Sequence, residues 1–145
     1  MAMMLNEEVG RGFSILGEGE CRWLLEKGAL GRVAVSVGAL PAVFPVNYAM
    51  AGDTIYFLTG MGTKLAAAVR GACVAFEVDD FNIRYHHGWS VLAVGEARMI
   101  EGAERERLLA SVALEPWAPG LREHLVAIRP EFLSGRRIGF VPDMP

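Results

Sequence analysis

The most constraining feature of the sequence is a run of 20 residues without a charged side chain, from Val33 to Gly52. A transmembrane helix needs about 20 such residues, so a membrane span has to be considered. The run does not have the pattern of a helix, because Val33, Val35 and Val37 alternate with small residues at the period of a strand. The turn sequence G-A-L-P at 38–41 then separates this segment from a second extended one. We therefore expect a buried β-hairpin and no membrane span.

The rest of the chain continues this β-rich pattern. Strands are expected at 31–37, 41–50, 54–59, 72–78, 88–100 and 125–128, and short helices at 18–27, 63–70 and 103–114. Residues 130–140 fit neither pattern. Because no full-length crossover helices separate the strands, an antiparallel barrel or sandwich is favoured over a parallel sheet. The expected fold class is mainly β (α+β), with residues 1–17 as an irregular N-terminal arm and residues 18–145 as one domain.

Charge and cysteine content narrow the class of protein. A net charge of −3 and a pI of about 5.6 leave no basic surface of the kind that binds nucleic acid. The first twelve residues include Glu7, Glu8 and Arg11 and contain no continuous apolar segment, so no secretory signal is expected. Cys21 and Cys73 are too far apart in sequence for a C-x-x-C motif. These features predict a cytoplasmic protein with reduced cysteines.

Motifs for hydrolysis and metal binding are not found in the sequence. There is no G-x-S-x-G segment, and no serine has a recognisable base partner. His86 and His87 are adjacent, so on a strand they would point to opposite faces and could not chelate one metal ion. His124 is remote from both. We therefore expect no metal site, and the sequence assigns no catalytic residue.

One turn has the composition of an anion-binding site. The segment L-T-G-M-G-T-K, from Leu58 to Lys64, leads from a strand into the start of a helix. Glycines allow a close approach of the backbone to an anion, and the Thr63 hydroxyl and the Lys64 ammonium can both contact phosphate. The same residues also fit a capped surface turn with a solvated lysine, and the spacing alone does not distinguish the two.

Trp89 also allows two interpretations. It begins the strand W-S-V-L-A-V-G-E-A-R-M-I, and a tryptophan at this position usually belongs to the core. An indole can also form the wall of a site for a flat aromatic ligand.

Several segments together resemble the pyridoxamine 5′-phosphate oxidase-like family of split β-barrel flavoproteins. The resemblance covers most of residues 20–140, in the family's order and spacing. It rests on the following runs: L-G-R-V-A-V-S-V-G-A-L-P-A-V-F-P-V-N-Y from Leu30, T-G-M-G-T-K-L from Thr59, F-E-V-D from Phe76, G-W-S-V-L-A-V-G-E-A from Gly88 and I-R-P-E-F-L-S-G-R from Ile128.

This resemblance implies a six-stranded antiparallel split β-barrel and a homodimer that binds FMN at the subunit interface. It implies that the strand segment Phe44, Pro45, Val46 and Asn47 lies against the flavin ring. The turn would hold the FMN phosphate through Thr59, Gly62, Thr63 and Lys64, and Trp89 and Ser90 would border the cofactor site. Arg136 is a weaker candidate contact.

The function expected from the resemblance is that of an FMN-dependent oxidoreductase acting on an unidentified small molecule. The cofactor would carry the redox chemistry, which fits a chain without an acid–base motif. An apolar pocket would then be shaped by Phe44, Tyr48 and Trp89. Three alternatives remain within the same fold: a reductase that uses the deazaflavin F420, a non-catalytic protein that binds a flavin or haem, and a split-barrel dimer without a cofactor.

Overall fold

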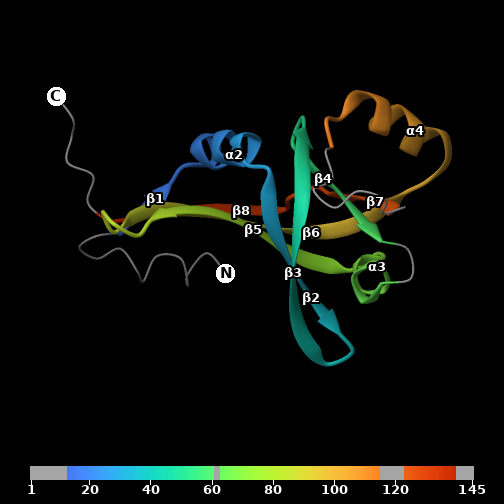
Figure 1. Ribbon diagram of the computed structural model, residues 1–145, viewed down its shortest axis with the longest axis horizontal. Helices are drawn as coiled ribbons and strands as arrows, with labels where there is room; N and C mark the ends of the chain where they lie inside the picture. The colour runs from blue at the N-terminus through green and yellow to red at the C-terminus, as the bar shows by residue number, and fades with distance from the viewer. Residues whose placement is uncertain (1–12, 61–62, 115–122, 140–145) are drawn as a thin grey trace.

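The computed structural model describes residues 13–60, 63–114 and 123–139 of the 145-residue chain. Figure 1 shows the helices of these described residues, α2, α3 and α4, around one continuous set of strands. In chain order the elements are β1 (Phe13–Leu16), α2 (Glu18–Lys27), β2 (Leu30–Val37), β3 (Leu40–Ala51), β4 (Thr54–Gly60), α3 (Lys64–Val69), β5 (Cys73–Asn82), β6 (His87–Ile100), α4 (Gly102–Ser111), β7 (Glu123–Ile128) and β8 (Phe132–Ile138).

Six of the strands close into an antiparallel barrel. Their order is β6-β5-β2-β3-β4-β7, and β7 pairs back onto β6 to complete the ring. These six strands correspond one by one to the six predicted from the sequence, so the prediction of a six-stranded antiparallel barrel is confirmed. The uncharged run forms the β2–β3 hairpin, as expected. Within the described residues, no helix combines the length and the apolar character that a membrane crossing requires.

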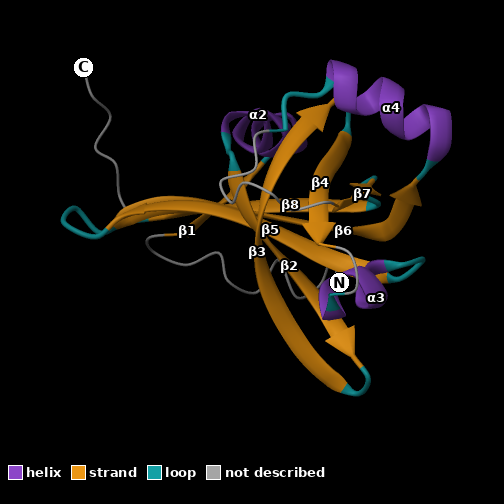
Figure 2. Cartoon of the chain, turned by 45° about the vertical axis from the view of Figure 1, so that its right-hand side comes forward, coloured by secondary structure: helices purple, strands orange, loops and turns teal. Residues whose placement is uncertain are grey.

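Two further strands extend the sheet beyond the barrel. β8 pairs with β6, and β1 pairs with β8, so that β1, β8, β6 and β5 form an arm that projects from the barrel (Figures 1 and 2). β1 lies in the segment expected to be irregular, and β8 lies in the segment that fitted neither pattern. β5 and β6 also extend further than expected toward their shared hairpin. Residues 79–82 pair in register with β6, although they are polar or exposed.

The core fills the barrel and continues beneath α2. Phe57, Phe76 and Val33 are fully buried inside the barrel. Helix α2 turns Cys21, Leu24 and Leu25 inward and lies over one face of the arm (Figure 1). One face of the arm is therefore covered by α2 where it meets the barrel. The opposite face, named here the outer face, is covered by no helix of the described residues.

A buried hydrogen bond ties the barrel to the end of α2. The Tyr48 hydroxyl donates to the carbonyl oxygen of Leu25 at 2.6 Å, and its ring meets Phe76 edge-on with centroids 4.9 Å apart. Burial raises the pKa of Tyr48 well above its ordinary value. This tyrosine is 4% exposed and packs in the core, rather than lining a pocket as expected from the sequence.

We expect Tyr48→Phe to lower the free energy of unfolding by about 1–2 kcal/mol, because the buried Leu25 carbonyl loses its partner while the ring keeps its packing. Urea unfolding measures the change. Tyr85→Phe is the matched control, since Tyr85 is exposed and lies at the far hairpin turn. Equal stability of the Tyr48 variant and the wild type would contradict this assignment.

Candidate functional site

The barrel wall has a break between β3 and β4. The ladder between these strands covers only Tyr48 to Ala51, although β3 begins at Leu40 and β4 continues to Gly60. Within the part of the chain that the structure describes, residues 40–47 therefore pair with β2 alone. The Tyr48 N–H donates to the Ala29 carbonyl, so by alternation the peptide groups of 45 and 47 point away from β2, toward the break. Pro45 carries no N–H and suits a position outside a ladder.

Side chains along this part of β3 alternate between the two sides of the wall. Val46 is buried and Phe44 is half-buried against the core, so both face the barrel interior. Pro45 is exposed and Asn47 is half-buried, and both face the outside. The Asn47 side-chain amide reaches the Ala29 carbonyl at 3.5 Å. Of the four predicted β3 residues, two therefore present side chains to the outer face and two to the core.

The turn after β4 is capped as its sequence suggests. The Thr63 hydroxyl accepts from the N–H of Ala66 and lies 2.8 Å from the Gly60 carbonyl. Thr59 is 4% exposed, and its hydroxyl lies 3.1 Å from that of Thr63. Lys64 follows at the surface. Gly62, the fourth predicted residue of this turn, lies outside the described residues.

Trp89 and Ser90 point to opposite faces of β6. Trp89 pairs across with Asp80 and Ser90 with Asp79, and successive residues of a strand alternate in direction. Trp89 lies on the face covered by α2 and packs partly against the core. Ser90 lies on the outer face beside Arg136. The two residues therefore do not line the same side of the sheet.

A charged cluster lies on the outer face. Arg32 Nη1 is 3.2 Å from Glu77 Oε2, and Arg32 Nη2 is 3.6 Å from Asp79 Oδ1. Burial, followed by the neighbouring Asp79 carboxylate, raises the pKa of Glu77 to about 7, although Arg32 acts in the opposite direction. A cavity of about 250 Å³ lies next to this cluster. Its lining residues are Glu77, Ser90, Leu92, Ser134, Gly135 and Arg136.

The raised pKa of Glu77 makes stability depend on pH. The folded chain keeps a proton on Glu77 between pH 4.5 and about 7, where the unfolded chain has lost it, so stability decreases as pH rises through this window. We expect the wild type to lose roughly 1–2 kcal/mol more than Glu77→Gln across it, after allowance for solvent screening. Urea unfolding at pH 4.5 and pH 8 compares the two. Identical pH dependence in both proteins would contradict the assignment.

The sequence alone did not single out Arg32 and Glu77. They are 45 positions apart and become neighbours only because β2 pairs with β5 in the register Arg32↔Glu77. The available signal was one charged residue within the mainly apolar run L-G-R-V-A-V of β2 and one within C-V-A-F-E-V of β5.

Comparisons with known proteins agree with this fold. The family model of pyridoxamine 5′-phosphate oxidase matches residues 17–137. An uncharacterised protein of Mycobacterium tuberculosis, Rv0080, is 35% identical over 113 aligned positions, and the match covers 74% of each chain. The structure of the FAD binding protein from Mycobacterium smegmatis is 34% identical, has a TM-score of 0.74 and is similar over 87% of this chain and 98% of that one. A conserved protein of unknown function from Corynebacterium diphtheriae is 29% identical, with a TM-score of 0.73 over 90% of this chain and 99% of that one.

The family match begins just before α2 and ends within β8, so it takes in the whole barrel and the break in its wall. The chain belongs to the pyridoxamine 5′-phosphate oxidase family.

Proposed function

We propose that this chain is a flavin-dependent oxidoreductase that acts on a small molecule and binds FMN, or the FMN half of a larger flavin, between the two subunits of a homodimer. The observation that carries the proposal is the break in the barrel wall, with a polar turn at one end of it. The similar protein of Mycobacterium smegmatis, 34% identical over nearly its whole length, is named an FAD binding protein.

The β3 side of the break suits a flavin ring. Among the described strands, residues 44–47 have a neighbour on one side only, and the peptide groups of 45 and 47 point away from it. A flat ring with polar atoms along one edge can hydrogen-bond to peptide groups presented in this way. We assign Pro45 and Asn47 to direct contact with the ring, with Phe44 and Val46 supporting the strand from the core.

The turn after β4 suits the phosphate. The hydroxyls of Thr59 and Thr63 lie 3.1 Å apart, and Lys64 adds a positive charge at the surface beside them. A phosphate oxygen can replace the Gly60 carbonyl as the acceptor of the Thr63 hydroxyl. We assign Thr59, Thr63 and Lys64 to phosphate contact, together with Gly62.

A bound flavin would supply hydride or electron transfer. The residues of the chain would position it: β3 orients the ring, the turn fixes the phosphate, and Ser90 and Arg136 offer polar groups on the outer face where a substrate can approach. The Trp89 side chain lies on the α2 face, so it would support β6 from the side away from the flavin instead of touching it.

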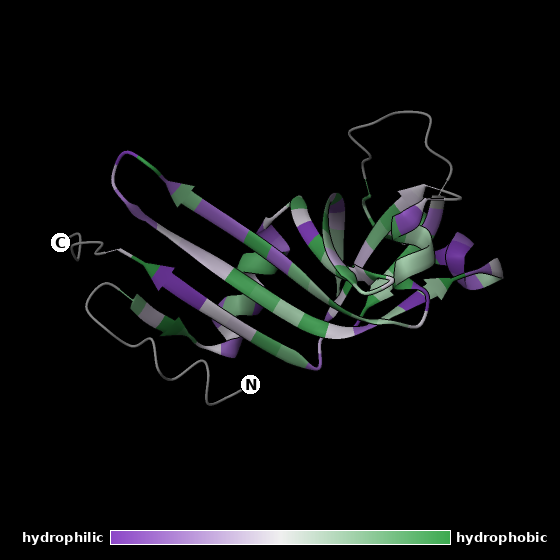
Figure 3. Ribbon diagram, turned by 90° about the horizontal axis from the view of Figure 1, so that it is seen from below, coloured by the Kyte–Doolittle hydropathy of each residue, from purple (hydrophilic) through white to green (hydrophobic). Residues whose placement is uncertain are grey.

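The outer face supports a dimer with a second copy of the chain. Figure 3 views the molecule from below and shows bands of hydrophobic residues along its strands. The register places on the outer face large apolar side chains that are 43–63% exposed, around the cluster of Arg32, Glu77 and Asp79. These residues are Phe13, Ile15, Val43, Phe81 and Phe132. A monomer rarely leaves so many apolar side chains uncovered on one face.

The test begins with the protein as purified. We expect flavin absorbance near 370 and 450 nm, a general property of oxidised flavins, and release of FMN or FAD identified by mass spectrometry. Titration of the flavin-free protein with FMN, FAD and F420 then compares the three cofactors. Tighter binding of F420 than of FMN and FAD would favour the deazaflavin reductase, and absence of binding to all three would refute the proposal. A flavin-loaded protein that no acceptor reoxidises after reduction would indicate a carrier or sensor.

A further inference from the structure

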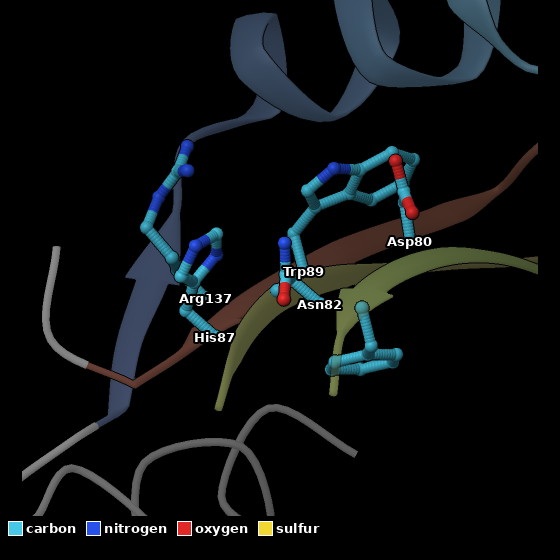
Figure 4. Close-up of a pocket in the computed structure, with 7 residues that line it drawn as sticks. Asp80, Asn82, His87, Trp89 and Arg137 are labelled. Atoms are coloured by element: carbon cyan, nitrogen blue, oxygen red, sulfur yellow. The ribbon is translucent and has the colours of Figure 1, made fainter. Parts of the chain in front are cut away.

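A second cavity lies on the other side of the arm from the proposed flavin site. It has a volume of about 330 Å³ and opens on the face that α2 covers in part (Figure 4). Figure 4 shows the labelled side chains pointing to this same side of the sheet, below the helix. They are Asp80, Asn82, His87, Trp89 and Arg137.

Strand register explains why these side chains converge. Arg137 of β8, Trp89 of β6 and Asp80 of β5 are direct cross-strand neighbours and form one row. His87 and Asn82 pair with each other two residues further along β6 and β5, on the same face. Adjacent strands lie about 4.8 Å apart, so the backbones of Arg137 and Asp80 are roughly 10 Å apart. The Trp89 indole lies between their two charged groups.

The charged groups of this row have no ionic partner among the residues that the structure describes. Across residues 13–60, 63–114 and 123–139, Arg137 and Asp80 make no ion pair with another described residue. Asn82 accepts the N–H of Tyr85 at its Oδ1, which leaves its side-chain NH₂ as a donor. The ring of His87 is held parallel to Tyr85, with centroids 6.3 Å apart.

Each group selects one part of a ligand. A guanidinium binds a carboxylate through two parallel hydrogen bonds, an indole stacks on a flat ring, and the Asp80 carboxylate accepts N–H donors. The volume is at the lower end for small-molecule sites and suits a single ring with its substituents. We propose that this cavity binds a single-ring aromatic acid that carries an amino group at the end opposite its carboxylate.

The experiment uses three probes on the protein as purified: 4-aminobenzoate, benzoate and aniline. Binding is followed by the NMR signal of the Trp89 indole N–H, assigned with Trp89→Phe. We expect 4-aminobenzoate to bind more tightly than either single-function probe. Arg137→Gln should weaken 4-aminobenzoate and benzoate about 10-fold and leave aniline unchanged, while Asp80→Asn should weaken 4-aminobenzoate and aniline only.

Arg136→Gln is the matched control, because Arg136 is the neighbouring arginine on the opposite face of β8. It should leave the dissociation constants of all three probes unchanged. Equal losses in the two arginine variants, or no saturable shift of the Trp89 signal at millimolar 4-aminobenzoate, would overturn the proposal. So would a change in flavin absorbance that follows probe binding and is insensitive to Arg137→Gln, because the probe would then occupy the flavin site. The proposal is independent of flavin binding, since flavin content and probe affinity are measured separately.

Discussion

Val43→Glu is expected to convert the proposed dimer to a monomer at micromolar concentration and to release the proposed flavin at the same time. Val43 is 63% exposed on the outer face of β3, two residues before Pro45 and across from Ala34. A second copy placed on this face would bury an unpaired carboxylate at two symmetric positions, at a cost of several kcal/mol each. The dimer dissociation constant should rise by at least about 100-fold.

Sedimentation velocity over a range of concentrations measures this change, and absorbance of the same samples reports the flavin. Trp23→Glu is the control, because Trp23 is 53% exposed on α2, on the far side of the sheet. Its variant should keep both the dimer and the flavin. A Val43→Glu protein that remains dimeric would show that another surface joins the subunits, and a monomer that retains flavin would place the cofactor within one chain.

The barrel strands could be predicted because their signal is local. Val33, Phe57 and Phe76 each belong to a run of alternating apolar residues with turn residues at its ends, and burial on one face maintains that alternation. The uncharged run from Val33 to Gly52 has the same cause, since its hairpin packs on the core and, in the proposed dimer, is covered from outside as well.

The arm could not be predicted, because two of the segments that form it carry no local strand signal. The strand β8 reads F-L-S-G-R-R-I, and residues 79–82 of β5 read D-D-F-N, so neither segment has the composition of a strand. They become strands because β6 is long enough to pair with both. Such pairing depends on partners tens of residues away, which a local pattern does not contain.

The positions of the candidate site residues likewise depend on strand pairing, which a local sequence pattern does not contain. Trp89 and Ser90 were both expected to border the cofactor site from the family resemblance, but neighbouring residues of a strand send their side chains to opposite faces. Conversely, Trp89 and Arg137 are neighbours through the β6–β8 register although they are far apart in sequence. The turn from Thr59 to Lys64 was predictable because its contacts, from the Thr63 cap to the Gly60 carbonyl, lie within a few residues.

Lys64→Ala is expected to weaken FMN binding by about 10- to 100-fold and to leave the fold intact. The side chain is exposed at the first residue of α3, and the buried contacts of this helix come from Leu65, Ala66 and Val69. The variant therefore removes a charge from the proposed phosphate site without removing core packing. A charge-assisted hydrogen bond contributes roughly 1.5–3 kcal/mol, which corresponds to the stated change in affinity.

The chain provides its own control, because Lys27 is the only other lysine in the sequence. Its Nζ lies 3.4 Å from the centroid of the Trp23 ring on α2, which covers the opposite face of the arm. Lys27→Ala removes the same charge and should leave the FMN dissociation constant unchanged. Riboflavin, which lacks the phosphate, separates the remaining possibilities. If Lys64 contacts the phosphate, its variant should bind riboflavin as the wild type does, whereas an equal loss for FMN and riboflavin would move Lys64 from the phosphate to the ring.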